Sequence, residues 1–281
     1  MTTIEPDLDR VDAISVHDLV EIRADKKLPW QPISEAKSRT LSEMAAGAVF
    51  PQQVWGLEFS CKPLRMIEVD VPQSSGLTQR RLVWYLVYRV RNTGVGLTPK
   101  VQVDGSFETE AAKGTPVRFL PEFTLVSQDR DKVGEKVGKA YLDRLIPAAL
   151  EPIRRRELSQ GTLLDSVAMA EQSLPVESGR MQKGVWGVAM WDGVDPQMDF
   201  FSVFVGGLTN AYKWSDPAGA YQAGDPPGKG RQFARKTLQL NYWRPGDELE
   251  QNEREIRYGT APGQGQLYDS GEGVAHQWVY R

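Results

Sequence analysis

Hydrophobic and polar residues alternate along much of the chain, and this period of two predicts a protein built mainly from β-strands. The longest such stretch is RLVWYLVYRVRN (81–92). One face of the expected strand is apolar throughout, whereas the other begins apolar at Val83 and ends with Arg89 and Arg91. Because successive side chains point to opposite faces of a strand, the second face is expected to start in a core and end in solvent.

Two strongly apolar runs, 185–191 and 200–205, lie on either side of the connector DGVDPQ (192–197). Both faces of each run are apolar, which predicts strands that are covered on both sides. The Asp-Gly and Asp-Pro pairs of the connector favour a turn, because glycine accepts positive φ and proline presets the turn backbone. The two runs therefore predict a β-hairpin around which the rest of the chain is organised.

Helical spacing interrupts the strand pattern in two places. Apolar residues recur at helical spacing over about 133–158, with an interruption at Pro147, and a shorter helix is expected after Ser34. The segment 163–169 is expected to be another strand. Pro121 lies inside a strand-like run and predicts an edge position or a bulge there.

The expected fold is mainly β, with a β-sandwich-like architecture of one or two lobes, a helical insertion and an irregular N-terminal arm. The expected parts are an N-terminal arm with a short helix (1–52), a first β-sandwich-like lobe (53–128), the helical insertion (129–160) and a second β-rich lobe (161–281). The two lobes form either two domains or one continuous domain.

Charge and hydropathy narrow the classes of partner. The 281 residues include 34 basic and 37 acidic side chains, and a net charge of −3 offers no broad field for nucleic acid or an anionic membrane. No window approaches eighteen uninterrupted apolar residues, so no membrane span is expected. The start, MTTIEPDLDR, lacks the basic and apolar regions of a signal peptide. The chain as written is therefore expected in the cytoplasm, and export would require that a signal peptide has been removed.

The sequence contains few cysteine and histidine side chains. Cys61 is the single cysteine, which excludes an intrachain disulfide and favours a small buried apolar role over a reactive thiol. Only two histidines are present, so zinc sites rich in histidine are excluded by counting. No catalytic residue is assigned, and calcium is the one cofactor that the sequence suggests.

Asp192, Asp195 and Asp199 form the sharpest polar cluster of the sequence. Calcium needs several oxygen ligands on a flexible loop, and three aspartates within eight residues can contribute two or three of them. The competing interpretation is that Asp192 and Asp195 build the turn through bonds from side chain to backbone, while Asp199 leads into the next strand. A second pair of acids, Glu68 and Asp70, shares one face of an expected strand. A carbohydrate-cleaving enzyme requires two carboxylates that face each other across the substrate, so this pair would serve only if both acids faced a substrate.

Several segments carry a resemblance to known sequences: FSCKPLRMIEVDVP (59–72), VWYLVYRVRNTG (83–94), GVAMWDGVDPQMDFFSVFVGGLTNAY (187–212), KTLQLNYWRPGDE (236–248) and HQWVYR (276–281). They span most of residues 55–281. In them the chain resembles an uncharacterised family of bacterial proteins of the planctomycete type, usually labelled hypothetical or secreted. The resemblance implies export in relatives and brings no activity and no site residues with it.

Two functional hypotheses follow from the sequence. The first is a non-catalytic interaction or structural module, in which a β-sandwich presents loops to a protein or glycan partner. The second is a carboxylate-dependent enzyme, carbohydrate-active or assisted by calcium, which the acidic connector and the eight tryptophans suggest.

Overall fold

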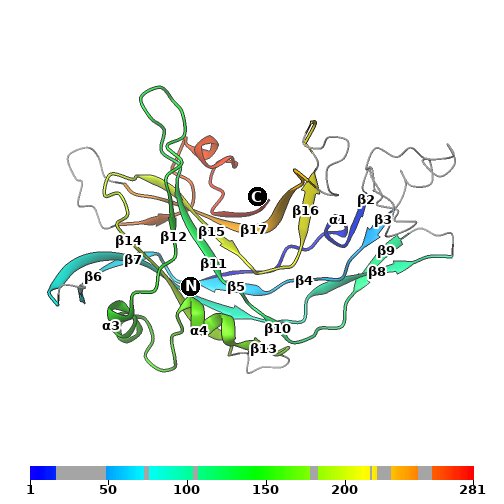
Figure 1. Cartoon of the computed structure of the whole chain (residues 1–281), viewed down its shortest axis with the longest axis horizontal. Coiled ribbons are helices and arrows are strands. Elements are labelled where there is room, and N and C mark those ends of the chain that lie inside the picture. Colours follow the sequence, from blue (N-terminus) through cyan, green and yellow to red (C-terminus); the bar gives the residue numbers. More distant parts are fainter. Residues whose placement is uncertain are drawn as a thin grey trace.

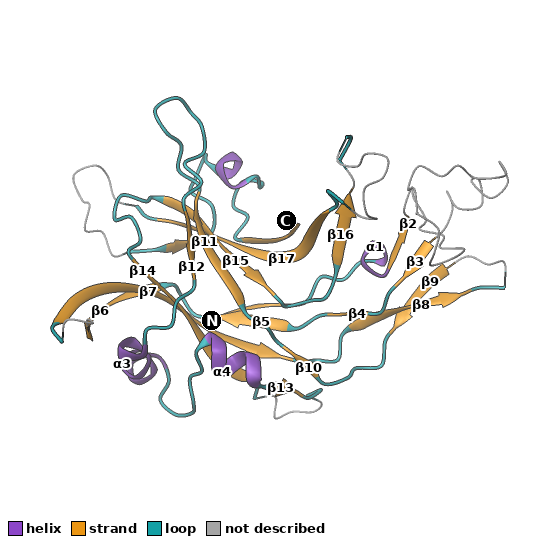
Figure 2. Cartoon of the chain, in the orientation of Figure 1, coloured by secondary structure: helices purple, strands orange, loops and turns teal. Residues whose placement is uncertain are grey.

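Two antiparallel β-sheets pack face to face in the computed structural model (Figures 1 and 2). The structure describes residues 1–16, 49–72, 76–103, 107–177, 183–215, 217–219, 229–245 and 255–281. Helices are few and short by comparison with the strands. The prediction of a mainly β, sandwich-like fold is therefore confirmed.

The two sheets draw their strands from both β-rich stretches of the sequence. The first sheet contains β1 (Thr2–Ile4), β5 (Glu58–Cys61), β6 (Arg65–Pro72), β7 (Thr78–Arg91) and β14 (Val185–Asp192). The second contains β11 (Glu122–Ser127), β12 (Ala140–Leu142), β15 (Phe200–Gly206), β16 (Tyr212–Ser215), β17 (Gln232–Trp243), β18 (Arg257–Tyr258) and β19 (His276–Tyr280). Strands that are distant in sequence therefore share one core.

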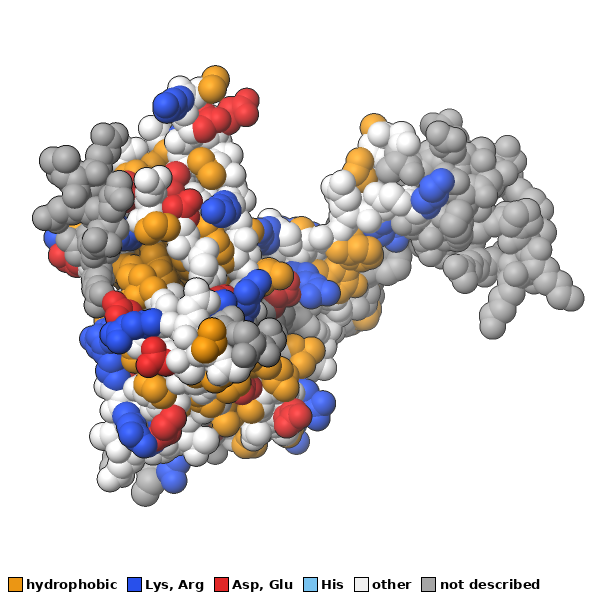
Figure 3. All heavy atoms as spheres, turned by 60° about the vertical axis from the view of Figure 1, so that its left-hand side comes forward, with side chains coloured by type: hydrophobic (Ala, Val, Ile, Leu, Met, Phe, Trp, Pro, Cys, Tyr) orange, Lys and Arg blue, Asp and Glu red, His pale blue; other side chains and the backbone are white. Residues whose placement is uncertain are grey.

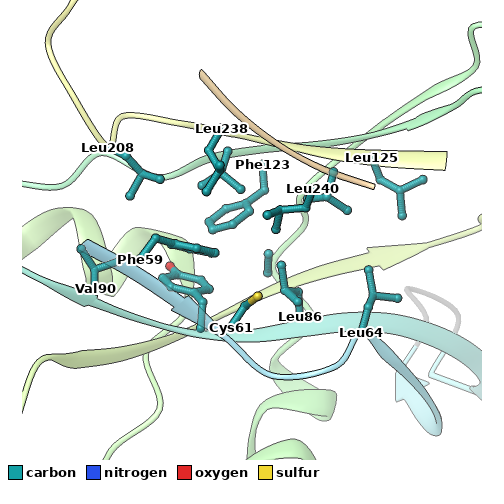
Figure 4. Packing of buried hydrophobic residues seen from close by; sticks show 14 of the residues in the cluster. Phe59, Cys61, Leu64, Leu86, Val90, Phe123, Leu125, Leu208, Leu238 and Leu240 are labelled. Atoms are coloured by element: carbon teal, nitrogen blue, oxygen red, sulfur yellow. The ribbon is translucent and has the colours of Figure 1, made fainter. Parts of the chain in front are cut away.

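The core lies between the inner faces of these sheets (Figure 4). From the first sheet it receives Phe59, Cys61 and Leu86, and from the second it receives Phe123 and Leu240, all of them buried. Aromatic rings contact one another across the layer, as in Trp84 and Phe201, whose ring centroids are 5.4 Å apart. Burial raises the pKa of the Cys61 thiol to about 12, in agreement with its predicted role as a small apolar residue.

A helix covers the opposite face of the first sheet. Helix α3 (Pro147–Glu157) packs its buried Ala149 and Ile153 against Val83 and Val87 of β7, together with residues of β14. Strand β14 is therefore enclosed by the second sheet on one side and by α3 on the other. This explains why both faces of its sequence are apolar.

The predicted hairpin between the two apolar runs is wrong. Strand β14 pairs with β7 in the first sheet, whereas β15 pairs with β11 and β17 in the second. The loop 193–199 crosses from one sheet to the other instead of turning back along the same sheet. Turn residues favour a reversal of the chain, but they do not determine which strand becomes the hydrogen-bonding partner.

Two helical predictions also need correction. The helix expected over 133–158 is present only from Pro147, which occupies its first turn, where a missing N–H costs nothing. The strand expected at 163–169 is instead helix α4 (Ser166–Glu171), because the Asp165 side chain accepts a hydrogen bond from the Ala168 N–H (2.8 Å) and caps it. The helix expected after Ser34 lies outside the described residues.

The first residues of the chain are anchored to both sheets. Strand β1 pairs with β5, and the short helix α1 (Arg10–Ala13) follows it. Asp12 of α1, whose side chain is fully buried, accepts a hydrogen bond from the Lys236 ammonium of β17 (2.7 Å). This contact joins the start of the chain to the second sheet.

Smaller elements complete the fold. They are β2 (Ile14–Val16), β3 (Val49–Pro51), β4 (Val54–Trp55), β8 (Gly96–Val101), β9 (Phe107–Ala111), β10 (Val117–Arg118), β13 (Ser173–Leu174) and the 3-10 helix η1 (Gly265–Tyr268). Figure 1 shows β8 and β9 extending away from the sandwich beside β2 and β3. Pro121 lies between β10 and β11, where the run predicted as one strand is interrupted. Over the described part of the chain, no helix is long and apolar enough to cross a membrane.

Candidate ligand-binding hollow

A hollow of about 540 Å³ opens beside the loop that joins the two sheets. Three separate parts of the chain line it: the end of β11 with the segment leading to β12, the loop 193–199 with the start of β15, and η1 with the residue before it. The lining residues are Ser127, Asp129, Arg130, Val137, Lys139, Tyr141, Asp195, Gln197, Met198, Asp199, Phe200, Gln264 and Leu267. We call this site the acidic hollow.

Asp129 holds the wall of the acidic hollow in place. Its Oδ1 atom accepts hydrogen bonds from the backbone N–H groups of Phe200 (2.9 Å) and Asp199 (3.3 Å). The Ser127 hydroxyl donates to its Oδ2 atom (2.8 Å). One side chain thereby joins β11 to the start of β15.

Asp195 shapes the loop itself. Its side chain accepts a hydrogen bond from the Gln197 N–H (3.0 Å), which is the geometry of an Asx turn. The Lys139 ammonium lies 3.4 Å from its other oxygen and also lies over the Tyr141 ring. The Tyr141 hydroxyl accepts from the Asp195 N–H (3.0 Å), so the loop contacts both Tyr141 of β12 and Lys139, the residue before that strand.

Asp199 differs from these two acids. Its carboxylate makes no hydrogen bond or ion pair within the described part of the chain, and the residue is only half-buried. Burial raises the pKa of Asp199, the nearby Asp129 charge raises it further, and Arg244 opposes both effects. Burial also raises the pKa of Asp129, although its hydrogen bonds from Phe200, Ser127 and Asp199 act in the opposite direction.

The structure brings together two of the three aspartates predicted as calcium ligands. Asp195 and Asp199 line the acidic hollow, whereas Asp192 lies at the end of β14. There its two carboxylate oxygens accept hydrogen bonds from Arg81 (2.7 Å) and Arg144 (3.1 Å). Among the described residues, no group of three or more His, Cys, Asp or Glu side chains is arranged to hold a metal ion. Calcium binding by Asp195 and Asp199 stays a prediction.

The second pair of acids lies elsewhere. Glu68 on β6 forms an exposed ion pair with Arg80 of β7 (2.7 Å), and Asp70 follows it on the same strand. Neither residue lines the acidic hollow. Of the tryptophans, Trp84 and Trp191 are buried in the core, while the Trp214 ring on β16 is stacked under Arg231.

Sequence reasoning missed Asp129, Tyr141 and Gln264, although they complete the acidic hollow. They are separated from the loop 193–199 by about 60 residues on either side. The pairing of β11 with β15 and β12 brings Asp129 and Tyr141 to the loop, and Gln264 lies between β18 and β19, which pair with β17 of the same sheet. A usable signal was present in SQDRD (127–131), where polar residues directly follow an apolar strand. Such residues at a strand end are positioned by the sheet and exposed to ligands.

Comparison with known proteins finds no match for this chain, either among protein-family models, among curated proteins or among solved structures.

Proposed function

We propose that the protein is a non-catalytic β-sandwich binding module whose acidic hollow takes a neutral glycan. The observation that carries the proposal is the lining of the hollow, which combines the unbonded Asp199 carboxylate with the amides of Gln197 and Gln264 and the rings of Tyr141 and Phe200. Carboxylates and amides accept and donate hydrogen bonds to sugar hydroxyls, and aromatic rings pack on the C–H face of a sugar.

The form of the site favours a glycan over a protein partner. Small ligands bind in concave sites of about 300–1,000 Å³, whereas protein interfaces are broad and need roughly 800 Å² from each partner. The acidic hollow falls in the first class. A neutral ligand also agrees with the surroundings, because Arg130 and Lys139 accompany the acids of the lining. On the face shown in Figure 3, acidic and basic side chains are interspersed.

A carboxylate-dependent enzyme is the second candidate function, and the proximity of Asp129 to Asp199 favours it, since each acid has a raised pKa. Hydrolysis of a glycosidic bond ordinarily requires two carboxyl groups that both reach the substrate. Asp129 is already occupied by two backbone N–H groups and the Ser127 hydroxyl. One available acid supports binding better than it supports general acid and base chemistry.

Calorimetric titration with a panel of neutral gluco-, xylo- and manno-oligosaccharides tests the proposal. We expect at least one series to bind and Asp199→Ala to weaken that binding about tenfold, which corresponds to the loss of one or two hydrogen bonds. The matched control is Asp70→Ala, which removes the same side chain from an exposed position on the other sheet and is expected to leave the affinity unchanged.

Three outcomes separate the hypotheses. Failure of every series to bind, or equal weakening by both variants, would contradict the glycan site. Release of shorter sugars during incubation would favour the carboxylate-dependent enzyme. An increase in the unfolding midpoint with millimolar calcium but not magnesium would favour calcium assistance, because a ligand that binds only the native state stabilises it.

A further inference from the structure

A second surface, on the outer face of the first sheet, concentrates positive charge around one tryptophan. Where α3 does not cover the sheet, a row of paired residues crosses its strands: Thr3 of β1, Ser60 of β5, Arg89 of β7 and Trp186 of β14. The Lys62 ammonium and the Arg89 guanidinium lie 5.8 Å and 5.7 Å from the centre of the Trp186 ring. We call Ser60, Lys62, Arg89 and Trp186 the Trp186 platform.

The cations near the platform outnumber the carboxylates. Lys62, Arg65 and Arg156 all lie within 3.9 Å of one buried carboxylate, that of Glu157, which also accepts a hydrogen bond from the Tyr85 hydroxyl. Lys62 additionally donates to the Glu157 carbonyl at the C-terminus of α3, where the helix dipole favours a cation. One carboxylate and one helix end therefore neutralise only part of the charge on three cations.

Arg89 adds a cation with no acidic partner. Within the described residues its guanidinium forms no ion pair, and its one hydrogen bond is the long contact from Nη2 to the Ser60 hydroxyl (3.4 Å). Of the acids nearby, Glu58 pairs with Arg91, and Glu177 accepts from the Gly184 N–H with one oxygen (2.9 Å), while its other oxygen is buried without a hydrogen-bond partner among the described residues. In a protein with a net charge of −3, this surface therefore carries a local positive excess.

We infer that the Trp186 platform binds a tetrahedral oxyanion, a sulfate or phosphate ester, carried on a sugar. Arg89 supplies guanidinium N–H donors of the kind that bind such an oxyanion, although its Nε atom is buried and has no hydrogen-bond partner among the described residues. Lys62 supplies a second charge. The half-buried indole of Trp186 offers an apolar ring against which the sugar packs. The platform lies on the other sheet from most of the acidic hollow and shares no residue with it, so the inference does not depend on the proposed function.

Titration with dextran sulfate and with unsulfated dextran of the same length tests the inference. We expect the wild type to bind the sulfated chain more tightly than the unsulfated one. We expect Arg89→Gln to weaken the binding of the sulfated chain at least tenfold and to leave any binding of the unsulfated chain unchanged. The matched control is Arg80→Gln, which makes the same change in charge on the same strand but at a residue that is already paired with Glu68. We expect this control to bind within about twofold of the wild type, because exposed charges far from the ligand are screened.

A second variant and a competition experiment test the same site. Trp186→Phe retains an apolar ring and is expected to weaken binding severalfold while the unfolding midpoint changes little, which covers the case in which Arg89→Gln does not fold. Inorganic sulfate and inorganic phosphate should compete with dextran sulfate, and the stronger competitor identifies the ester. Equal weakening by the variants of Arg89 and Arg80, or no binding of dextran sulfate by the wild type, would overturn the inference.

Discussion

Asp12 and Asp199 are two acids that are fully or partly buried in different regions of the protein, and their surroundings are opposite in kind. Asp12 of α1 is fully buried and is surrounded by donors: the Lys236 ammonium (2.7 Å), the Asp9 N–H (2.8 Å) and the Tyr280 hydroxyl. In the acidic hollow, Asp199 has no bonded donor among the described residues.

The pKa values of the two acids differ accordingly. Burial would raise the pKa of Asp12, but the hydrogen bonds from Asp9, Lys236 and Tyr280, with the charge of Lys236, lower it below its usual range. Burial and the charge of Asp129 raise the pKa of Asp199. The carboxylate oxygens of Asp12 therefore stabilise the fold, whereas those of Asp199 remain available to a ligand.

The largest expected effect comes from removing the cation beside Asp12. Lys236→Met leaves a buried carboxylate without its charged partner, which costs about 3–5 kcal/mol in comparable buried pairs. We therefore expect the free energy of unfolding, measured with urea, to fall by that amount, and strand β1 and helix α1 to become more accessible to hydrogen exchange.

The double variant Asp12→Asn with Lys236→Met is the control for that prediction. It removes the unpaired charge while the amide oxygen still accepts a hydrogen bond, so it should recover a substantial part of the lost stability. A decrease of less than about 1 kcal/mol in the free energy of unfolding of Lys236→Met is typical of exposed ion pairs. It would show that the contact between Asp12 and Lys236 does not stabilise the fold as a buried ion pair.

A smaller effect is expected at Asp129, which holds the wall of the acidic hollow. Asp129→Ala leaves the N–H groups of Asp199 and Phe200 without their acceptor, and we expect a loss of about 1–3 kcal/mol in the free energy of unfolding. Asp129→Asn should recover most of the loss, because the amide oxygen can accept the same two bonds. Equal losses in the two variants would show that the negative charge, rather than the acceptor, holds the loop.

The sequence predicted those parts of the fold that depend on local alternation. Val83 and Val87 lie on the face of β7 that begins in a core and ends near solvent at Arg89, as their pattern indicated. Local turn chemistry around Asp195 was also a sound interpretation, since its side chain does form an Asx turn. These features arise within a few residues, where propensity and periodicity determine the outcome.

The partners of the strands and the composition of the acidic hollow could not be obtained in the same way. The runs at 185–191 and 200–205 are each apolar on both faces, so they suit either a hairpin or two strands in different sheets. The choice depends on pairing with β7 and β11. The paired residues Val188 and Val87 are 101 residues apart along the chain, and Ser202 and Val126 are 76 residues apart. Asp129 reaches the loop 193–199 only through that pairing.

The smallest expected effect gives the sharpest comparison, because the two acids should change stability with pH in opposite directions. The pKa of Asp12 is lower in the folded protein than its ordinary value of 3.8, so its stabilising contribution is complete above that value and is lost as the pH falls through the lower folded pKa. The pKa of Asp199 is raised, so its charged form weakens the fold above the folded pKa, and this penalty disappears as the pH falls towards 3.8 and below. The free energy of unfolding of the wild type minus that of Asp12→Asn should therefore fall on acidification. The same difference for Asp199→Asn should rise towards zero, by at most about 0.5 kcal/mol, because solvent screens the half-exposed carboxylate. Urea unfolding at intervals between pH 7 and pH 3 measures both differences, and slopes of the same sign would remove the distinction between the acid that holds the fold and the acid that is available to a ligand.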